Sequence, residues 1–440
     1  MELFIQISQF ILSISILVVL HEFGHFLPAR WFGIKVEKFF LFFDVKFALF
    51  KKKIGETVYG VGWLPLGGYV KIAGMIDESM DKEQMAKPAE PWEFRSKPAW
   101  QRLIVMVGGV TVNVLLAWAI YSTMLVVYGD VYTPAGNLKY GIDVTTEGEA
   151  LGFMDGDQIL SIDGKPVKKF NSDLLFDVLL GDEATVRRDG KEVSFPISDQ
   201  GKKLILNNDK KGSPFIDTDR SNILHKVADT TIAYSSGFRG GEVITSINNT
   251  QTPFWSDIKE QIALARTNKD SLHITYQSNG SVSTITTFVP NDKNLGVLPK
   301  AEKFAVKDEY SVFAAIPKAW TQTIGVLKKQ VKQFKLIFNK EVQGYKNVKG
   351  PIGIVEMMSP TWDWYKFWSF TAMFSVWLAF VNILPIPALD GGHVMFLLYE
   401  MISGKKPSEK TLERGQIIGF VIVMGLMLVI FGNDIWNLFK

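Results

Sequence analysis

The feature that most constrains this chain is the pentapeptide HEFGH at residues 21–25, which directly follows an apolar run. Residues 3–20 carry no charge and are mostly Ile, Leu, Val and Phe, long enough to cross much of a bilayer as a helix. On a helix, His21 and His25 share one face and can bind one zinc ion, with Glu22 beside them as a general base. Because a charge inside a membrane segment costs roughly 2.5–3.5 kcal/mol, this cluster predicts a functional site.

The composition limits the classes of protein to consider. The chain has 440 residues, of which 47% are hydrophobic, and a formal net charge of +3. This nearly balanced charge gives no reason to expect nucleic-acid binding. There are no cysteines, so a zinc ion would be held by His, Asp or Glu. Three of the five histidines, His21, His25 and His393, lie in or beside apolar segments.

Four apolar stretches, at residues 3–20, 103–129, 367–389 and 415–433, are predicted to span a membrane. A cleaved signal peptide is the alternative for the first stretch, but no basic region precedes it, and HEFGH stands where a small-residue cleavage site would be. Buried helices of a soluble protein are the alternative for the others, although these stretches are apolar all round. The expected fold is a polytopic α-helical membrane protein with four transmembrane helices.

The distribution of basic residues predicts the orientation of these helices. The loops at residues 30–100 and 400–414 are rich in Lys and Arg, whereas the two terminal tails have almost none. By the positive-inside rule, both loops lie in the cytoplasm and residues 130–366 lie outside. HEFGH is then expected near the cytoplasmic end of the first helix.

The polar middle of the chain contains a repeat, in which GFMDGDQILSID at 152–163 aligns with GFRGGEVITSIN at 237–248. Each copy has a Gly-Phe turn, a second Gly followed by an acid, and a strand that alternates Ile with small polar residues. The pattern resembles the signature of bacterial PDZ domains, which implies a tandem pair over 130–300 that binds extended peptides by strand addition. Two β-rich domains without a peptide-binding role are the alternative.

An amphipathic helix is predicted after the repeats. Apolar residues recur every three or four positions from Phe313 to Phe338, with lysines between them and Pro317 in the first turns. Such a helix can lie on the membrane surface, brace the repeats against the spans, or pack on the soluble domains.

A catalytic zinc site usually has three protein ligands and a water, so a third ligand is required. The best candidate is Asp390, the first acid after a long uncharged run, within NILPIPALDGGH at residues 382–393. Two prolines should break the helix just before it, and broken backbone at membrane depth is tolerated only where it lines a cavity or is buried in protein. His393 is a rival ligand, and a kinked helix without a metal role is the other alternative.

Together these motifs resemble the site-2 protease family of intramembrane zinc metalloproteases, and within it the bacterial regulator-of-sigma-E protease branch. The resemblance implies one Zn²⁺ held by His21, His25 and Asp390, with Glu22 as the catalytic base. It implies substrates that are pre-trimmed single-span proteins, such as an anti-sigma factor, and signal peptide remnants. It also implies a place in the lipid bilayer of the bacterial inner membrane, with periplasmic PDZ domains.

Two further segments fit this resemblance. Residues 58–72 alternate like a hairpin and resemble the family's membrane-associated β-loop, which would offer an edge to a substrate strand at Gly67, Gly68 and Tyr69. A plain cytoplasmic hairpin is the alternative. Asn382 and Pro385 are expected to contact the substrate backbone, and helix packing alone is the alternative for Asn382.

A third segment, GGVTVN at residues 108–113, resembles the family's Gly-xxx-Asn element. Its Gly109 and Asn113 lie four residues apart, and helix packing alone also explains the pair.

The expected division of the chain follows from these assignments. It comprises a first transmembrane helix with HExxH (1–29), a cytoplasmic loop with the membrane-associated β-hairpin (30–100), a second transmembrane helix (101–129), two PDZ domains (130–219 and 220–300), an amphipathic helical linker (301–366), a third transmembrane helix with the LDG motif (367–402), a cytoplasmic loop (403–414) and a fourth transmembrane helix (415–440).

Two other classes of protein compete with a membrane protease. One is a non-enzymatic membrane scaffold that presents PDZ domains, which the intact set of His21, Glu22, His25 and Asp390 argues against. The other is a conventional zinc peptidase that works in the aqueous phase. That class would need a Glu ligand on a soluble helix, and no such Glu stands out in the sequence.

Overall fold

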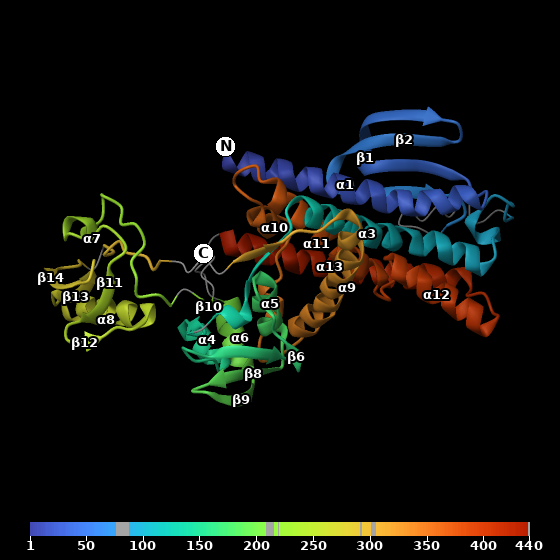
Figure 1. Cartoon of the computed structure of the whole chain (residues 1–440). Helices are drawn as coiled ribbons and strands as arrows, with labels where there is room; N and C mark the ends of the chain where they lie inside the picture. The colour runs from blue at the N-terminus through green and yellow to red at the C-terminus, as the bar shows by residue number, and fades with distance from the viewer. Residues whose placement is uncertain are drawn as a thin grey trace. The chain divides into compact units, whose positions relative to one another are not determined.

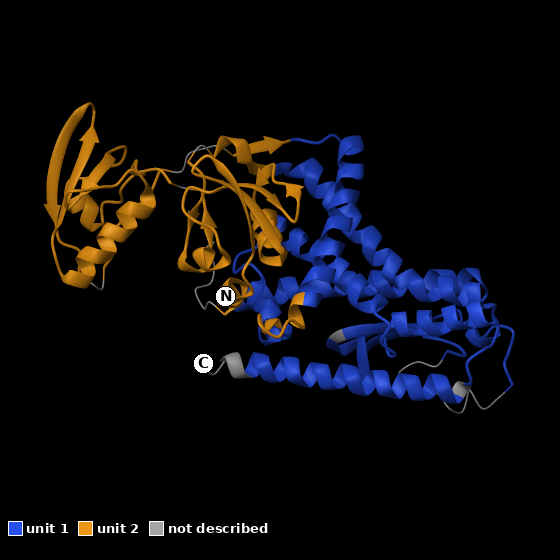
Figure 2. Ribbon diagram, turned by 90° about the horizontal axis from the view of Figure 1, so that it is seen from below, with its two compact units in different colours: residues 1–130, 309–335, 345–440 blue, residues 131–308, 336–344 orange. Residues whose placement is uncertain are grey.

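The computed structural model describes residues 1–75, 88–138, 140–207, 215–218, 220–290, 293–300 and 305–438. These residues form two compact units (Figure 2), which we call the helical unit (residues 1–130, 309–335 and 345–440) and the β unit (residues 131–308 and 336–344). The predicted domain boundary at residue 219 and the predicted start of the linker at residue 301 lie outside the described residues.

Four helices of the helical unit are long and apolar enough to cross a membrane, and they coincide with the four predicted stretches. Figure 1 shows them as α1 (Glu2–Trp31), α3 (Ala99–Val127), α11 (Trp364–Ile383) and α13 (Glu409–Leu438). Leu, Ile, Val and Phe cover all faces of these helices. No face is therefore suited to contact with water, as expected of a helix that spans a membrane.

The third span is shorter than predicted, because α11 ends at Ile383 and a separate helix, α12, begins at Asp390 and runs to Ser403. Pro385 and Pro387 lack the backbone N–H that would continue α11, and each restricts the residue before it. The predicted single segment 367–402 is therefore two helices joined by a short irregular link.

Small residues bring α1 and α3 into backbone contact. A Cβ added to Gly24 would lie 2.5 Å from the carbonyl oxygen of Gly108, so neither position tolerates a side chain. A polar contact joins α1 to α11, because the hydroxyls of Ser13 on α1 and Thr371 on α11 are 2.9 Å apart and buried. Both devices hold helices together in lipid, where hydrophobic burial offers no driving force between them.

Strands β1 (Val36–Ile54) and β2 (Thr57–Ile72) are long, and both change direction within their length. As a result, residues 36–41 of β1 pair with both arms of β2, and the second half of β1 pairs with the first arm again. This corrects the predicted hairpin over 58–72, because its two arms flank residues 36–41 instead of pairing with each other. The apolar run Phe39-Phe40-Leu41 explains the difference, since it offers two edges and buries Phe40 between the arms.

The predicted amphipathic helix is α9 (Val312–Ile337), which contains Pro317 near its start. Its small residues Ala315 and Ala319 are buried in one cluster with Ala372 and Val376 of α11. The remaining short elements of the helical unit are η1 (Phe94–Ser96), α10 (Pro351–Met357) and η3 (Gly344–Asn347), the last of which begins in the β unit.

Each sequence repeat forms a four-stranded antiparallel sheet with a helix. The first sheet has the order β6-β5-β8-β9 and the second has the order β12-β11-β13-β14. Their elements are β5 (Gln158–Ile162), β6 (Lys165–Pro166), α5 (Ser172–Leu180), β8 (Glu183–Arg188) and β9 (Lys191–Pro196), then β11 (Val243–Ile247), β12 (Thr250–Gln251), α8 (Trp255–Asn268), β13 (Leu272–Ser278) and β14 (Ser281–Thr287).

The repeated Gly-Phe turn explains the likeness of the two sheets. Phe153 and Phe238 occupy the same place in each repeat, and both are fully buried in their own apolar clusters. The other elements of the β unit are β3 (Asp130–Pro134), η2 (Ala135–Asn137), β4 (Asp143–Val144), α4 (Thr146–Leu151), β7 (Lys169–Phe170), α6 (Asp199–Leu206), β10 (Ile216–Asp217), α7 (Ile232–Ser235) and β15 (Val306–Asp308).

Candidate metal centre

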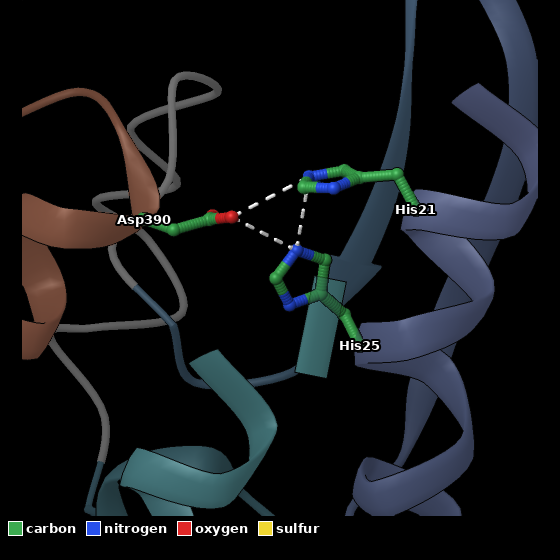
Figure 3. Close-up of side chains that lie close together, drawn as sticks. All are labelled: His21, His25 and Asp390. Atoms are coloured by element: carbon green, nitrogen blue, oxygen red, sulfur yellow. Dashed lines mark hydrogen bonds and ion pairs between the residues drawn. The ribbon is translucent and has the colours of Figure 1, made fainter. Parts of the chain in front are cut away.

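Three potential metal ligands from two distant parts of the sequence converge in the helical unit (Figure 3). His21 and His25 lie one turn apart on α1, and Asp390 is the first residue of α12. The Nε2 atoms of the two histidines are 3.3 Å apart, and they lie 3.4 Å and 3.3 Å from Oδ2 of Asp390. The prolines before α12 thus place the carboxylate where it faces both imidazoles.

This arrangement fits a zinc ion. Ligand atoms on a tetrahedral zinc with bonds of about 2.0–2.2 Å lie roughly 3.3–3.6 Å from one another, as these three atoms do. Oδ2 of Asp390 is buried and has no hydrogen-bond donor among the described residues. A buried carboxylate oxygen without a donor is costly, and a bound cation removes that cost.

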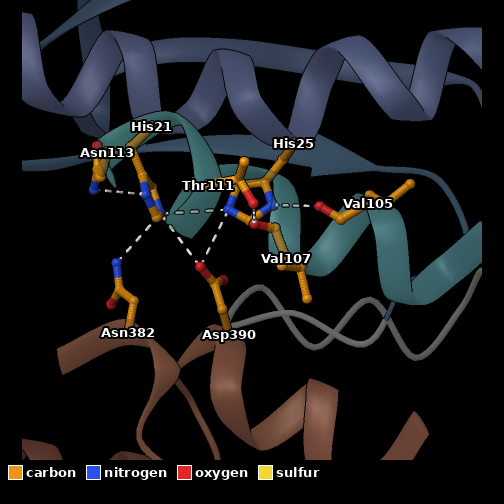
Figure 4. Close-up of polar contacts among 8 residues, drawn as sticks. All are labelled: His21, His25, Val105, Val107, Thr111, Asn113, Asn382 and Asp390. Atoms are coloured by element: carbon orange, nitrogen blue, oxygen red, sulfur yellow. Dashed lines mark hydrogen bonds and ion pairs between the residues drawn. The ribbon is translucent and has the colours of Figure 1, made fainter. Parts of the chain in front are cut away.

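The opposite nitrogen of each imidazole also has a partner, and both partners come from α3 (Figure 4). Nδ1 of His25 lies 2.8 Å from the carbonyl oxygen of Val105, so Nδ1 carries the proton and Nε2 is free to bind a metal. Nδ1 of His21 lies 3.1 Å from the side-chain amide of Asn113, whose oxygen serves as the acceptor when the amide is turned over. The sequence pattern points to Asn113 but not to Val105, because a backbone acceptor leaves no signal in the sequence.

Gly109 leaves the space in which these ligands meet. A Cβ at this position would lie 2.4 Å from Nε2 of His25 and 2.6 Å from Cε1 of His21. Any side chain on Gly109 would therefore occupy the place of a metal. Packing between helices alone does not account for this glycine, because the atoms it faces are imidazole atoms and not backbone.

Glu22 lies on α1 between the two histidines and faces the sheet. It accepts a hydrogen bond from the backbone N–H of Val70, on the second arm of β2. A Cβ on the neighbouring Gly68 would lie 3.7 Å from Cγ of Glu22 and 2.5 Å from Val18. The second arm of β2 therefore runs beside the metal cluster with its edge toward α1, and Gly68 makes that close approach sterically acceptable.

The other predicted contact residues lie at different distances from the cluster. The side-chain amide of Asn382, in the last turn of α11, is 3.3 Å from Nε2 of His21. Pro385 lies in the link between α11 and α12. Gly67 adopts φ +149°, which favours glycine at the bend of β2. Tyr69 stacks on Phe40 and donates its hydroxyl hydrogen to Asp44, so its side chain is held by β1 and is not part of the cluster.

His393, the rival ligand, is not one of the three converging groups. It lies one turn beyond Asp390 on α12 and lines a separate cavity. The helical period explains this, since a residue three positions on points roughly 60° away from Asp390 around the helix.

Comparison with known proteins agrees with this chemistry. Residues 9–426 match the family model of Peptidase family M50. The chain is 27% identical to a protein of Xylella fastidiosa that is named as a zinc metalloprotease, over 99% of both chains. It is 26% identical to the regulator of sigma-E protease RseP of Escherichia coli over 98% of both chains, and 25% identical to the protease RseP of Yersinia pestis over 99% of both.

Proposed function

Since this chain belongs to peptidase family M50 and is a zinc metalloprotease of the membrane, we propose that it cuts peptide bonds within the membrane-spanning segments of single-span proteins. The observation that carries the proposal is the cluster of His21, His25 and Asp390, held between helices long and apolar enough to span a bilayer. Peptide bonds that reach this cluster belong to segments already in the membrane.

In this proposal, His21, His25 and Asp390 hold zinc through Nε2, Nε2 and Oδ2. When bound, zinc supplies a Lewis acid that polarises the scissile carbonyl and lowers the pKa of water to about 7. Glu22 takes the proton from the attacking water and passes it to the leaving amine. The Val70 N–H orients the Glu22 carboxylate for this transfer.

A helical substrate hides its carbonyl groups in hydrogen bonds, so it must unwind before cleavage. The second arm of β2, with Gly67, Gly68 and Tyr69, offers a backbone edge beside Glu22 to which an unwound segment can add as a strand. The amide of Asn382, 3.3 Å from Nε2 of His21, is placed to bind the substrate backbone next to the scissile bond. Pro385 keeps the following link out of helical geometry and so leaves room for the substrate.

The β unit sets access in this proposal and takes no part in the chemistry. Its two repeats act as tandem PDZ domains that exclude proteins with large outside domains, so that only pre-trimmed substrates such as an anti-sigma factor or signal peptide remnants reach the cluster. The basic loops place the cluster near the cytoplasmic face of a bacterial inner membrane, with the β unit in the periplasm. Deleting residues 131–308 should then permit cleavage of an untrimmed substrate, whereas a plain loss of activity would indicate a recruiting role.

The test measures zinc content and cleavage in the same purified samples. Glu22→Gln removes the base but no ligand, so it should keep about one zinc per chain while cleavage of a single-span substrate falls by roughly 10²–10⁴-fold. Glu2→Gln, an exposed change at the start of the same helix, is the matched control. Full cleavage by Glu22→Gln would reject Glu22 as the base. If the well-folded wild type has neither zinc nor cleavage activity, the alternative of a non-enzymatic membrane scaffold would be favoured.

A further inference from the structure

A second site lies in the helical unit, apart from the metal cluster. It is a cavity of about 70 Å³, where the start of α3 meets the first half of α12, the link after α12 and the start of α13. A water needs about 10–15 Å³ by this measure, so the cavity accommodates a group of about five heavy atoms. Five of its lining residues carry the argument: Arg95, Arg102, Lys406, Phe94 and Phe396.

The charge of the walls is positive. Arg95, Arg102 and Lys406 line the cavity, and no acidic side chain is among its lining residues in the described part of the chain. Glu93 and Glu400, which are not lining residues, pair with Arg95 and Arg102. The carboxylates therefore hold the guanidinium groups in place without entering the cavity.

Arg102 and Lys406 are each held by hydrogen bonds to neighbouring segments. Arg102 is nearly buried and donates from Nε to the carbonyl of Lys97 and from Nη2 to Glu400. A guanidinium has five N–H groups, so Nη1 of Arg102 is left over for another acceptor. Lys406 donates to the carbonyl of Arg95 at 2.9 Å, which ties the link between α12 and α13 to η1. Preorganised Arg and Lys donors of this kind suit phosphate oxygens.

The position of the cavity along the helices favours the phosphate of a lipid headgroup over free phosphate. It lies at the starts of α3 and α13, two of the helices long and apolar enough to cross a membrane, and the ends of such helices meet the headgroup layer. Trp31 at the end of α1 and Trp100 at the start of α3 are 72% and 50% exposed, as expected for side chains in the interfacial layer. The walls combine the cationic groups with Phe94 and Phe396, so one side of an occupant would be charged and the other apolar. Basic pockets between membrane helices bind lipid headgroups by this combination.

We propose that this cavity binds the phosphate headgroup of an anionic phospholipid, with Arg95, Arg102 and Lys406 as the cationic contacts. The proposal does not depend on proteolysis, because none of these three residues belongs to the metal cluster.

The test uses the full chain in detergent and native mass spectrometry with added phosphatidylglycerol, phosphatidylcholine or inorganic phosphate. Wild type should retain phosphatidylglycerol at least tenfold better than the zwitterionic lipid. Lys406→Gln is an exposed change with little risk to folding. It should weaken phosphatidylglycerol binding roughly fivefold, which is the contribution of one lysine near a membrane surface to lipid binding. Lys405→Gln, the neighbouring lysine outside the cavity wall, is the matched control and should change nothing.

A change of opposite sign tests the same site. Glu400→Gln releases Arg102 from its carboxylate and should tighten phosphatidylglycerol binding, which a general loss of structure would not do. Equal binding by the Lys406 and Lys405 variants, or equal retention of the two lipids, would overturn the proposal. Displacement of the lipid by millimolar inorganic phosphate would show that the occupant is free phosphate and would overturn the lipid assignment.

Discussion

Two carboxylates, Asp157 of the β unit and Asp390 of the helical unit, have opposite surroundings. In the β unit, Asp157 is fully buried, accepts the N–H of Met154 and forms two hydrogen bonds with Arg188. In the helical unit, Oδ2 of Asp390 faces two imidazole nitrogens and no hydrogen-bond donor among the described residues. A satisfied buried acid stabilises the fold, whereas an unsatisfied one that faces other ligands indicates a site for a cation.

The two repeats of the β unit show a milder form of the same contrast. Glu242 occupies the place of Asp157 and accepts the N–H groups of Arg239 and Gly240. Ser278 stands at the end of β13, where the first repeat has Arg188 at the end of β8, so the second repeat has no ion pair there. The hydrogen bond and the charge of Asp157 raise the pKa of Arg188. Both repeats therefore have a carboxylate that accepts backbone N–H groups in the turn, and the first repeat has an ion pair as well.

The largest effect is expected from Asp390→Asn. An amide oxygen is a poor zinc ligand, so zinc affinity should fall by more than the roughly 10–100-fold that loss of an outer partner costs. The substitution keeps the size of the side chain, so the zinc-free protein should stay folded. Zinc titration and thermal unfolding of the apo protein measure the two effects. Unchanged zinc binding would remove Asp390 from the ligand set.

Gly109→Ala should come next. The added Cβ would lie 2.4 Å from Nε2 of His25, so it should lower zinc affinity at least about tenfold, although Ala favours a helix over Gly by about 1 kcal/mol. Gly425→Ala, in α13, adds the same methyl group where nothing lies within 4 Å and is the matched control. Zinc affinities that match in the two variants would mean that α3 can move away from the histidines.

Asp157→Asn should destabilise the first repeat by about 2–3 kcal/mol, because it breaks a buried charge pair but keeps an acceptor for Met154. Zinc content should not change. Hydrogen exchange of the strands β5 and β8 in the full chain measures the loss, with the exposed Asp189→Asn as control. Equal protection in both variants would show that the ion pair adds no stability.

The smallest effect is expected from Glu242→Gln, at about 1 kcal/mol. The Gln oxygen still accepts one backbone N–H, and no arginine is left without a partner. Hydrogen exchange of β11 and β13 provides the measurement. A loss as large as that of Asp157→Asn would break the contrast between the two repeats.

Local patterns carried most of the prediction from sequence. The four-residue spacing of His21 and His25 and the apolar length of the spans depend only on helical geometry, and both agree with the structure. The prolines before Asp390 indicate a break in the helix, and this break makes Asp390 the candidate for the third metal ligand. The pairing of residues 36–41 with both arms of β2 was not predictable, because each segment alternates in the same way and nothing local specifies its partner. The carbonyl of Val105 and the cationic cavity also depend on contacts between distant segments.

The contact of Gly24 with Gly108 also decides the direction from which a peptide can approach. A strand needs about 4.7–4.9 Å beside its neighbour, and the two backbones leave no such gap, since a single Cβ at Gly24 would already lie 2.5 Å from a carbonyl oxygen. α3 therefore blocks access to the metal cluster from that side. Under the proposed function, a substrate reaches the cluster from the side of β2 and Asn382.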